Sequence, residues 1–179
     1  MTDKIYVIGH KSPDTDSVTS AITYANLKNA LGMKEAVPAA AGDINAETKF
    51  LLDHFKVPYP EKLTDATDKK VILVDHNEMA QAVDNLNMEN IVEIVDHHKI
   101  GGLATGKPIF FLNEPVGATG GIIANLYEMN NVPISKEMAG LMMSAILSDT
   151  VLFKSPTCTP RDKTAVEKLA KIAGVDPMS

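Results

Sequence analysis

The histidine and aspartate residues of this sequence are concentrated directly after short apolar runs. Four of the five histidines lie in such places: His10, His76, His97 and His98. The same places contain four aspartates: Asp14, Asp16, Asp75 and Asp96. Imidazole and carboxylate groups are common ligands of divalent metals such as manganese, cobalt and zinc. These positions therefore predict a metal site. His54, beside Phe55 in a helical pattern, is expected to be a surface or half-buried histidine outside that site.

The first segment, residues 9–17, reads Gly-His-Lys-Ser-Pro-Asp-Thr-Asp-Ser. Asp14 and Asp16 are two positions apart, so in an extended loop their side chains point the same way and each can serve a different ion. Lys11 brings a positive charge to the same rim, and we expect it to bind an anionic substrate. The alternative for Asp16 is capping of the helix that follows, because Asp and Ser are common helix caps.

Asp75 follows the apolar run from Lys70 to Val74. A carboxylate at this point, in the middle of the rim, is well placed to bridge two cations. The residues after it, 76–78, would support the site or face the substrate, and we assign Asn77 to substrate binding. The alternative is an ordinary acidic residue in the loop that ends a strand.

Asp96, His97 and His98 are the most specific signal in the chain. Adjacent side chains of an extended segment point in opposite directions, so we expect one histidine to bind metal and the other to face the substrate. Asp96 can orient a ring by accepting its second N–H. The alternative is a pair of solvated loop histidines.

Two further segments give weaker signals. Asp149, in Ser-Asp-Thr at the end of a helical pattern, can add a carboxylate to the site, although this tripeptide also suits a turn. The segment 113–121 opens a helix after a strand and contains several glycines. Its backbone N–H groups can hold an oxyanion.

Short β-rich runs alternate with longer helical patterns along the chain. Strands are expected over residues 4–8, 36–40, 70–74, 91–95 and 108–112, and helices over 17–31, 45–55, 79–86, 120–129, 136–147 and 159–173. This alternation predicts an α/β fold with a parallel sheet of about five strands and helices on both faces. Proline opens the last strand, which suits an edge. Ligands of such sheets bind at the carboxyl ends of the strands, where the predicted metal ligands lie.

The composition excludes several classes of protein. Hydrophobic residues make up 45% of the chain and charged residues 22%, as in globular proteins, so residues 1–179 are expected to form one domain. The formal net charge of −6, without a basic patch, argues against a nucleic-acid partner. No apolar run approaches the ~20 residues of a membrane span, so no membrane partner is expected. The single cysteine, Cys158, fits a reducing compartment, and we expect a cytoplasmic protein.

Five motifs together carry a resemblance to a known family. They are His-Lys-Ser-Pro-Asp-Thr-Asp-Ser at 10–17, Asp-His-Asn-Glu at 75–78, Asp-His-His at 96–98, Asn-Glu-Pro-Val-Gly at 113–117 and Ser-Asp-Thr at 148–150. In their order and spacing the chain resembles the DHH phosphoesterase domain of the manganese-dependent (family II) inorganic pyrophosphatases. The resemblance covers essentially the whole chain. Asp-His-Asn-Glu is its more specific motif, because the wider superfamily shares Asp-His-His.

The resemblance implies hydrolysis of pyrophosphate to two phosphates with two Mn²⁺ ions, with Co²⁺ as a possible substitute and Mg²⁺ accompanying the substrate. It implies one ion held by His10, Asp14 and Asp75. The ligands implied for the other ion are Asp16, Asp75, His97 and Asp149, so Asp75 is the bridge. His98 is implied to touch the phosphate of the substrate, which makes Asp75 and His98 the expected catalytic residues.

The resemblance also implies a homodimer and a second, C-terminal domain whose Lys and Arg residues clamp pyrophosphate. That domain is absent from this chain, so we expect the isolated chain to be weak or inactive as an enzyme. Three alternatives are open. Another DHH phosphoesterase, such as a single-strand exonuclease or a dinucleotide phosphodiesterase, would need basic and aromatic surface, yet aromatic residues make up only 5% of the chain. A phosphorylatable receiver domain would leave the motif at 96–98 unexplained. The third is a metal-binding domain without turnover.

Overall fold

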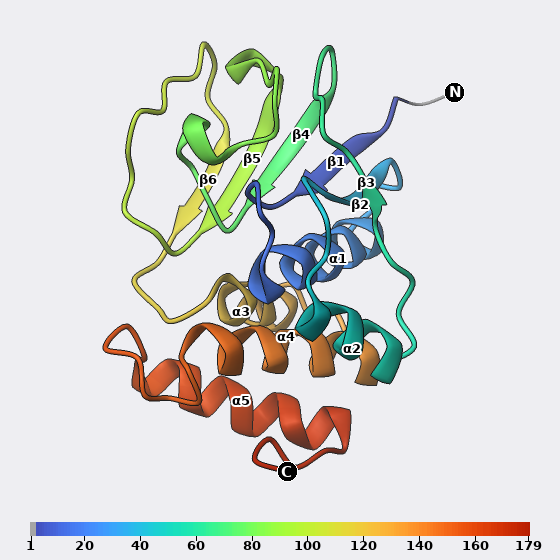
Figure 1. Ribbon diagram of the computed structural model, residues 1–179, viewed down its shortest axis with the longest axis vertical. Helices are drawn as coiled ribbons and strands as arrows, with labels where there is room; N and C mark the ends of the chain where they lie inside the picture. Colours follow the sequence, from blue (N-terminus) through green and yellow to red (C-terminus); the bar gives the residue numbers. More distant parts are fainter. Residues whose placement is uncertain (1–2) are drawn as a thin grey trace.

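A six-stranded sheet forms the centre of the computed structural model, which describes residues 3–179 (Figure 1). The strand order is β3-β2-β1-β4-β5-β6, and every neighbouring pair is parallel. The strands are β1 (Ile5–Ile8), β2 (Ala36–Ala40), β3 (Glu61–Lys62), β4 (Lys70–Val74), β5 (Ile91–Asp96) and β6 (Phe110–Asn113). The predicted α/β fold is confirmed. The sheet has one strand more than expected because β3 consists of two exposed charged residues and has no apolar pattern.

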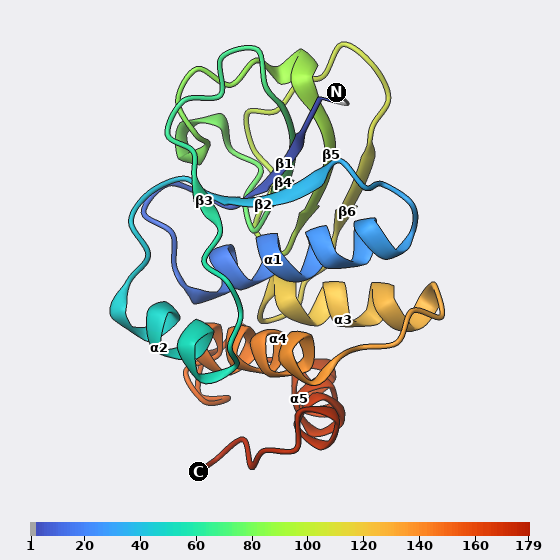
Figure 2. The same cartoon turned by 90° about the vertical axis from the view of Figure 1, so that its right-hand side faces the viewer.

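The α-helices lie on one side of the sheet, in successive layers (Figure 2). They are α1 (Thr15–Ala30), α2 (Ala46–His54), α3 (Thr119–Met129), α4 (Lys136–Asp149) and α5 (Pro160–Ala173). Helices α1 and α3 pack directly on the strands, α4 packs on both of them, and α5 packs on α4. At most of the helix ends, the boundary predicted from the sequence differs from the observed one by one or two residues.

The opposite face of the sheet is covered by loops and by two 3₁₀-helices, η1 (Met79–Gln81) and η2 (Met88–Asn90). Both faces therefore carry helical segments, as predicted, but those on this face are single turns. The longer helix expected over 79–86 ends early because Ala82 is extended and Asn85 is left-handed, with φ 59°. Ala82 and Val83 are buried instead of forming a further helical turn.

The core is divided by the sheet because successive side chains of a strand point to opposite faces. Val7 and Val74 belong to the cluster beneath the helices, whereas Ile8 and Leu73 belong to the cluster beneath the loops. The central strands are consequently buried on both faces and read as continuous apolar runs. Such strands form a firm support for the loops that follow them.

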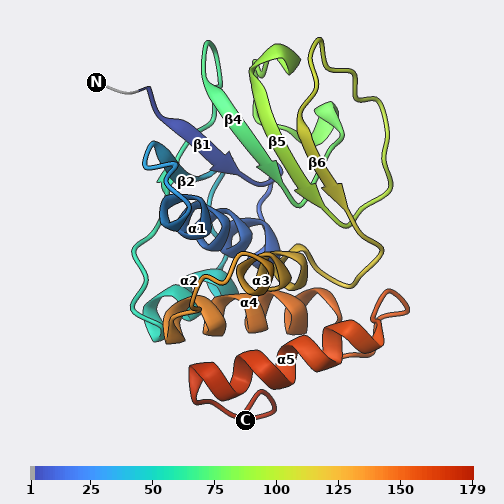
Figure 3. The same cartoon turned by 180° about the vertical axis from the view of Figure 1, so that it is seen from behind.

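The strands β1, β4, β5 and β6 all end at the same edge of the sheet (Figure 3). The carboxyl ends of β1, β4 and β5 lead into the segments that contain five of the six predicted metal ligands, and β6 leads toward helix α3. As expected, the strand that follows Pro108 is an edge strand: β6 has a neighbour on one side only. Among residues 3–179, no helix combines the length and the hydrophobicity that crossing a membrane requires.

Candidate metal centre

The structure brings together all six side chains that the sequence predicts as metal ligands. They come from five places in the fold: the loop after β1, the first turn of α1, the residue after β4, the residue after β5, and the end of α4. In that order, the residues are His10, Asp14, Asp16, Asp75, His97 and Asp149. They form two groups of potential ligand atoms, and Asp75 belongs to both. A third possible group, which also contains Asp75 and His97, is completed by the exposed His98.

The first group consists of His10, Asp14 and Asp75, whose ligand atoms all lie within 4.8 Å of one another. His10 Nε2 is 3.5 Å from Asp14 Oδ2 and 3.4 Å from Asp75 Oδ2. Asp14 also caps helix α1, because its Oδ1 accepts a hydrogen bond from Ser17 N at 2.9 Å. The alternative assignment of capping to Asp16 is therefore wrong, and the cap carboxylate keeps its second oxygen for this group.

The second group consists of Asp16, Asp75, His97 and Asp149. His97 Nε2 lies 3.2 Å from Asp75 Oδ1, 3.4 Å from Asp149 Oδ2 and 3.8 Å from Asp16 Oδ2. Asp75 thus presents Oδ2 to the first group and Oδ1 to the second. This is the arrangement that a carboxylate bridging two cations requires.

Two buried atoms of these groups have no hydrogen-bond partner among residues 3–179: Asp75 Oδ2 and His97 Nε2. A buried polar atom without a partner costs about 1–3 kcal/mol. Both atoms are good ligands of a divalent metal ion, and each faces further carboxylate oxygens. The residues therefore fit a pair of bound cations, which would satisfy the two atoms.

Hydrogen bonds to backbone carbonyls orient the two imidazoles that belong to these groups. His97 Nδ1–H donates to Val116 O at 2.9 Å, and His10 Nδ1–H donates to Lys11 O at 2.7 Å. A carbonyl oxygen can only accept, so Nδ1 carries the proton and Nε2 faces the carboxylates. Metal-binding histidines are commonly fixed in this way.

The charges of the site shift one another strongly. Burial raises the pKa of Asp16 well above its usual range, and the carboxylates of Asp75 and Asp149 raise it further. Burial also opposes the charged forms of His10 and His97, yet the neighbouring carboxylates outweigh it and raise the pKa of each imidazole to about 11. For Asp75, the two imidazoles outweigh burial and hold the pKa below its usual range. The imidazoles thus hold protons where bound cations would otherwise balance the carboxylates.

The start of helix α3 holds Asp16 in place, a contribution that sequence reasoning missed. Asp16 accepts hydrogen bonds from Thr119 N at 2.7 Å, from Gly120 N at 2.9 Å and from Ser20 Oγ at 2.9 Å. Thr119 Oγ1 also donates to Asp75 Oδ1 at 3.1 Å. The amides of this glycine-containing turn do hold an oxyanion, but it is a carboxylate of the chain itself.

His98 lies beside His97 and is much more exposed. Asp96 Oδ1 accepts the Nδ1–H of His98 at 2.7 Å, so Asp96 orients His98 and not His97. The side chain of His98 is 46% exposed, compared with 9% for His97. The expectation that the two rings point in opposite directions is wrong, because their centroids are only 4.2 Å apart. Strand β5 ends at Asp96, so both histidines lie beyond the regular alternation of the strand.

Asn77, which we expected to bind substrate, is 1% exposed and fully engaged within the chain. Its Nδ2 donates to Asp96 Oδ2 at 2.7 Å and to Lys99 O at 2.9 Å, and its Oδ1 accepts from Gly101 N at 3.0 Å. Asn77 is therefore a support for Asp96 and the following loop, and its burial keeps it from direct contact with a ligand.

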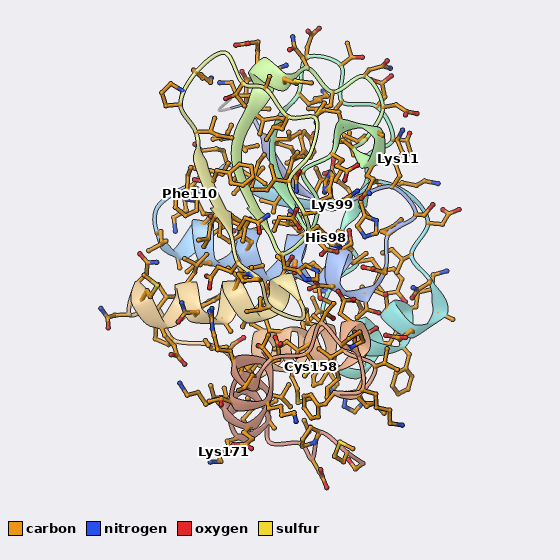
Figure 4. The ribbon with its side chains drawn as sticks, turned by 90° about the vertical axis from the view of Figure 1, so that its left-hand side faces the viewer. Lys11, His98, Lys99, Phe110, Cys158 and Lys171 are labelled. Atoms are coloured by element: carbon orange, nitrogen blue, oxygen red, sulfur yellow. The ribbon has the colours of Figure 1, made fainter. Side chains whose placement is uncertain are left out.

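Lys11 points to a different partner from the one that the sequence suggests. Its Nζ forms an ion pair with Asp84 Oδ1 at 2.6 Å on the exposed loop that follows η1. In Figure 4, Lys11 and Lys99 lie above His98, and Lys99 is 86% exposed beside Glu78. His54 lies away from this centre, as expected, where its ring packs between Phe50 and Phe55.

The N-terminal domain of the DHH family matches residues 4–146. The chain belongs to the DHH family. This membership confirms the resemblance that the motifs carry, and the parallel sheet with its rim of aspartates and histidines is the DHH domain of this chain.

Several relatives of this DHH chain are pyrophosphatases by name. A manganese-dependent inorganic pyrophosphatase of Methanothrix thermoacetophila is 75% identical over 177 residues, which cover 99% of this chain and 57% of that protein. One of Bacillus subtilis is 48% identical over 176 residues, again 57% of its length. The chain therefore spans little more than half the length of these curated relatives.

Among the solved structures that share the fold of the DHH chain are the following two. One is a Methanococcus jannaschii protein provisionally named a family II inorganic pyrophosphatase, with a TM-score of 0.86 and 45% identity over 96% of this chain and 57% of that one. The other is an exopolyphosphatase-related protein from Bacteroides fragilis, with a TM-score of 0.72 and 18% identity over 97% of this chain and 54% of that one. At this identity the second likeness shows the fold alone.

Proposed function

We propose that this chain is the metal-binding part of an enzyme that hydrolyses inorganic pyrophosphate to two phosphates, with two Mn²⁺ ions as cofactors. The observation that carries the proposal is the pair of ligand groups that share Asp75. In this assignment His10, Asp14 and Asp75 hold one ion. Asp16, Asp75, His97 and Asp149 hold the other.

The choice of metal and substrate rests on the donor set and on the named relatives. Carboxylates mixed with imidazoles suit manganese, and Co²⁺ can replace it at such a site. The relatives with 75% and 48% identity are named manganese-dependent inorganic pyrophosphatases. We assign Mg²⁺ to the substrate, which binds cations of its own in solution.

Two divalent cations bound by these residues would lower the pKa of water and neutralise phosphoryl oxygens. The residues of the chain supply the geometry. Asp75 holds its two oxygens toward the two groups, which fixes the separation of the bound charges. His98 is exposed at the rim, and the hydrogen bond to Asp96 raises its pKa, so its ring can donate Nε2–H to a phosphoryl oxygen. In this role His98 contacts the substrate, while Asp96 and Asn77 position its ring.

We assign the substrate clamp to the part of the longer relatives that this chain does not cover, since it spans 57% of their length. The described residues offer few free cations at the rim, because Lys11 is paired with Asp84 and Lys99 lies near Glu78. Each charge-assisted hydrogen bond to a phosphate contributes about 1.5–3 kcal/mol. Loss of two or three such hydrogen bonds would lower kcat/KM by about three or more decades. We further propose a cytoplasmic homodimer that acts without nucleic acid or membrane.

The test compares this chain with a longer protein that adds the second domain of a relative. Measure bound manganese per chain after dialysis, and phosphate release from magnesium pyrophosphate. We expect two ions on both proteins and efficient hydrolysis only by the longer one. Equal efficiency would show that residues 1–179 hold the complete active site.

The same two proteins also distinguish pyrophosphate hydrolysis from the alternative activities of DHH phosphoesterases. A longer protein that binds two ions, ignores pyrophosphate and cleaves a cyclic or linear dinucleotide would overturn the choice of substrate. A wild-type chain that does not bind two ions would overturn the metal assignment.

A further inference from the structure

Asp162 lies outside both ligand groups, in the first turn of helix α5, and is 2% exposed. Its Oδ2 accepts hydrogen bonds from Thr159 N at 2.7 Å and from Thr159 Oγ1 at 2.8 Å. Gly117 N donates to both of its oxygens, at 3.1 Å and 2.9 Å. The contacts with Thr159 belong to the capping box of α5, but the contact with Gly117 does not. It links the helix to a loop 45 residues earlier in the chain.

The loop around Gly117 carries the hydrogen bonds that orient two of the potential metal ligands. The residue before it, Val116, accepts the Nδ1–H of His97. The residues after it, Thr119 and Gly120, donate their backbone N–H groups to Asp16. A shift of Gly117 would therefore move the partners of both His97 and Asp16.

The same point of the structure is packed against Thr150, the neighbour of the ligand Asp149 in the sequence. A Cβ atom added to Gly117 would lie 2.5 Å from Thr150 Cγ2 and 2.9 Å from Asp162 Oδ2, so the backbone of Gly117 is wedged between these side chains. Thr150 is fully buried, and it is the residue that follows Asp149. Asp16, His97 and Asp149 all belong to the second ligand group. The loop also reaches Asp75, but through Thr119 Oγ1 and the oxygen Oδ1 that faces this second group. His10 and Asp14 lie on the loop after β1, and among residues 3–179 they have no such link to Asp162.

We propose that Asp162 is a positioning residue for the second ligand group, acting through Gly117 on Asp16 and His97. This inference rests on the proposed function only in taking that group to hold a metal ion. Residues that support metal ligands from outside the coordination sphere commonly change metal affinity 10–100-fold when they are replaced. Asp162 acts through two intervening contacts, so we expect an effect toward the lower end, about ten-fold.

The first experiment is a Mn²⁺ titration of Asp162→Ala by calorimetry, beside the wild-type chain. Reference isotherms come from His10→Gln, which weakens the first group, and His97→Gln, which weakens the second. We expect Asp162→Ala to resemble His97→Gln, with one affinity reduced about ten-fold and the other unchanged.

Thr159→Ala is the matched control, because it removes the side-chain cap of the same helix and leaves Gly117 N bonded to Asp162. Thermal unfolding shows how much each variant destabilises α5. The proposal expects Thr159→Ala to lower the unfolding midpoint and leave both Mn²⁺ affinities unchanged. Equal loss of affinity in both variants, or loss at both ions in Asp162→Ala, would show that Asp162 acts only through general stability and would overturn the proposal.

A second measurement requires no metal, so it tests the positioning role of Asp162 separately from the proposed function. The ring ¹⁵N signals of the metal-free chain report the Nδ1–H of His97, and His10 serves as the internal control. We expect Asp162→Ala to shift the His97 signals and leave those of His10 in place. If Asp162→Ala fails to fold, the isosteric Asp162→Asn decides, since its amide replaces one of the two oxygens that accept from Gly117 N with an NH₂ group that cannot accept. A folded variant with unshifted His97 signals would overturn the inference about Asp162. A wild-type chain that binds no Mn²⁺ would overturn the proposed function, but the NMR test of Asp162 would still apply.

Discussion

Asp75 differs from the other acidic residues of the site in its backbone as well as its side chain. Its φ is 61°, a left-handed conformation that few non-glycine residues adopt but that Asp tolerates better than most. Its N–H donates to Val95 O at 3.0 Å, so the turn remains attached to strand β5. This turn directs the carboxylate of Asp75 between the two ligand groups.

Replacement of Asp75 by alanine should therefore weaken both metal sites together. We expect each Mn²⁺ affinity to fall about 100-fold or more, since replacing residues that only support the metal ligands already lowers metal affinity 10–100-fold. Elemental analysis after dialysis measures the retained metal. Asp43→Ala, which removes an exposed acidic side chain from the surface, is the control and should retain two ions. Retention of one ion at wild-type affinity would show that Asp75 does not bridge.

His97 and His98 should separate in function although their rings are neighbours. His97→Gln is expected to weaken the second metal site, because Nε2 of His97 faces its three carboxylates. His98→Gln is expected to keep both ions and to lower kcat of the longer protein about 10²–10⁴-fold, the range typical of a group that transfers or shares a proton in the transition state. His54→Gln serves as the control histidine. Equal metal loss in the two variants would contradict the separation.

At the scale of elements, the start of α3 combines two glycines with different surroundings. A Cβ on Gly120 would lie 2.9 Å from Ala145 Cβ and 3.2 Å from Met142 O, so Gly120 permits the close crossing of α3 and α4. A Cβ on Gly121 would meet nothing closer than 3.6 Å, an ordinary contact. The crossing requires one glycine, and the second only loosens the helix.

Gly121→Ala should therefore stabilise the chain by about 0.5–1 kcal/mol, through the lower entropy cost of alanine in a helix. Gly120→Ala should destabilise it by about 1–3 kcal/mol, the usual cost of an extra group in a packed core. Chemical denaturation measures the free energy of unfolding of each variant. Changes of the same sign in both variants would contradict this assignment of the two positions.

At the scale of the whole molecule, the sheet ends on one side at β6, where Phe110 is 48% exposed. An exposed edge strand is a template for pairing with another chain. We expect a homodimer in which the two sheets meet at β6. Burial of a phenylalanine contributes about 1.5–3 kcal/mol, so its loss raises a dissociation constant about ten-fold or more.

Sedimentation of Phe110→Lys tests this arrangement, because a lysine on the edge should shift the chain toward the monomer. Phe50→Lys is the matched control, since Phe50 is 66% exposed on α2, away from the edge. A wild-type chain that is monomeric at micromolar concentration, or a Phe110→Lys variant that remains dimeric, would contradict the edge pairing.

The sequence by itself determined which elements form and which residue types gather at the rim. Alternating apolar runs and helical patterns are local signals, so β2 and β4 were predicted with the bounds that the structure has. The position of five of the six predicted ligands followed from one topological rule, because the ends of parallel strands share an edge. Asp149 ends helix α4, so the rule does not place it. These conclusions required only neighbours in the sequence and the handedness of the connections.

Tertiary structure decided how the side chains around the ligands are used. Beyond the end of a strand no regular period fixes side-chain direction, so the adjacent rings of His97 and His98 could not be placed from their spacing. The burial of Asn77 depends on a loop 24 residues later, and the support of Asp16 by Thr119 spans 103 residues. Such contacts form only when the chain packs, and a single sequence carries no local pattern for them.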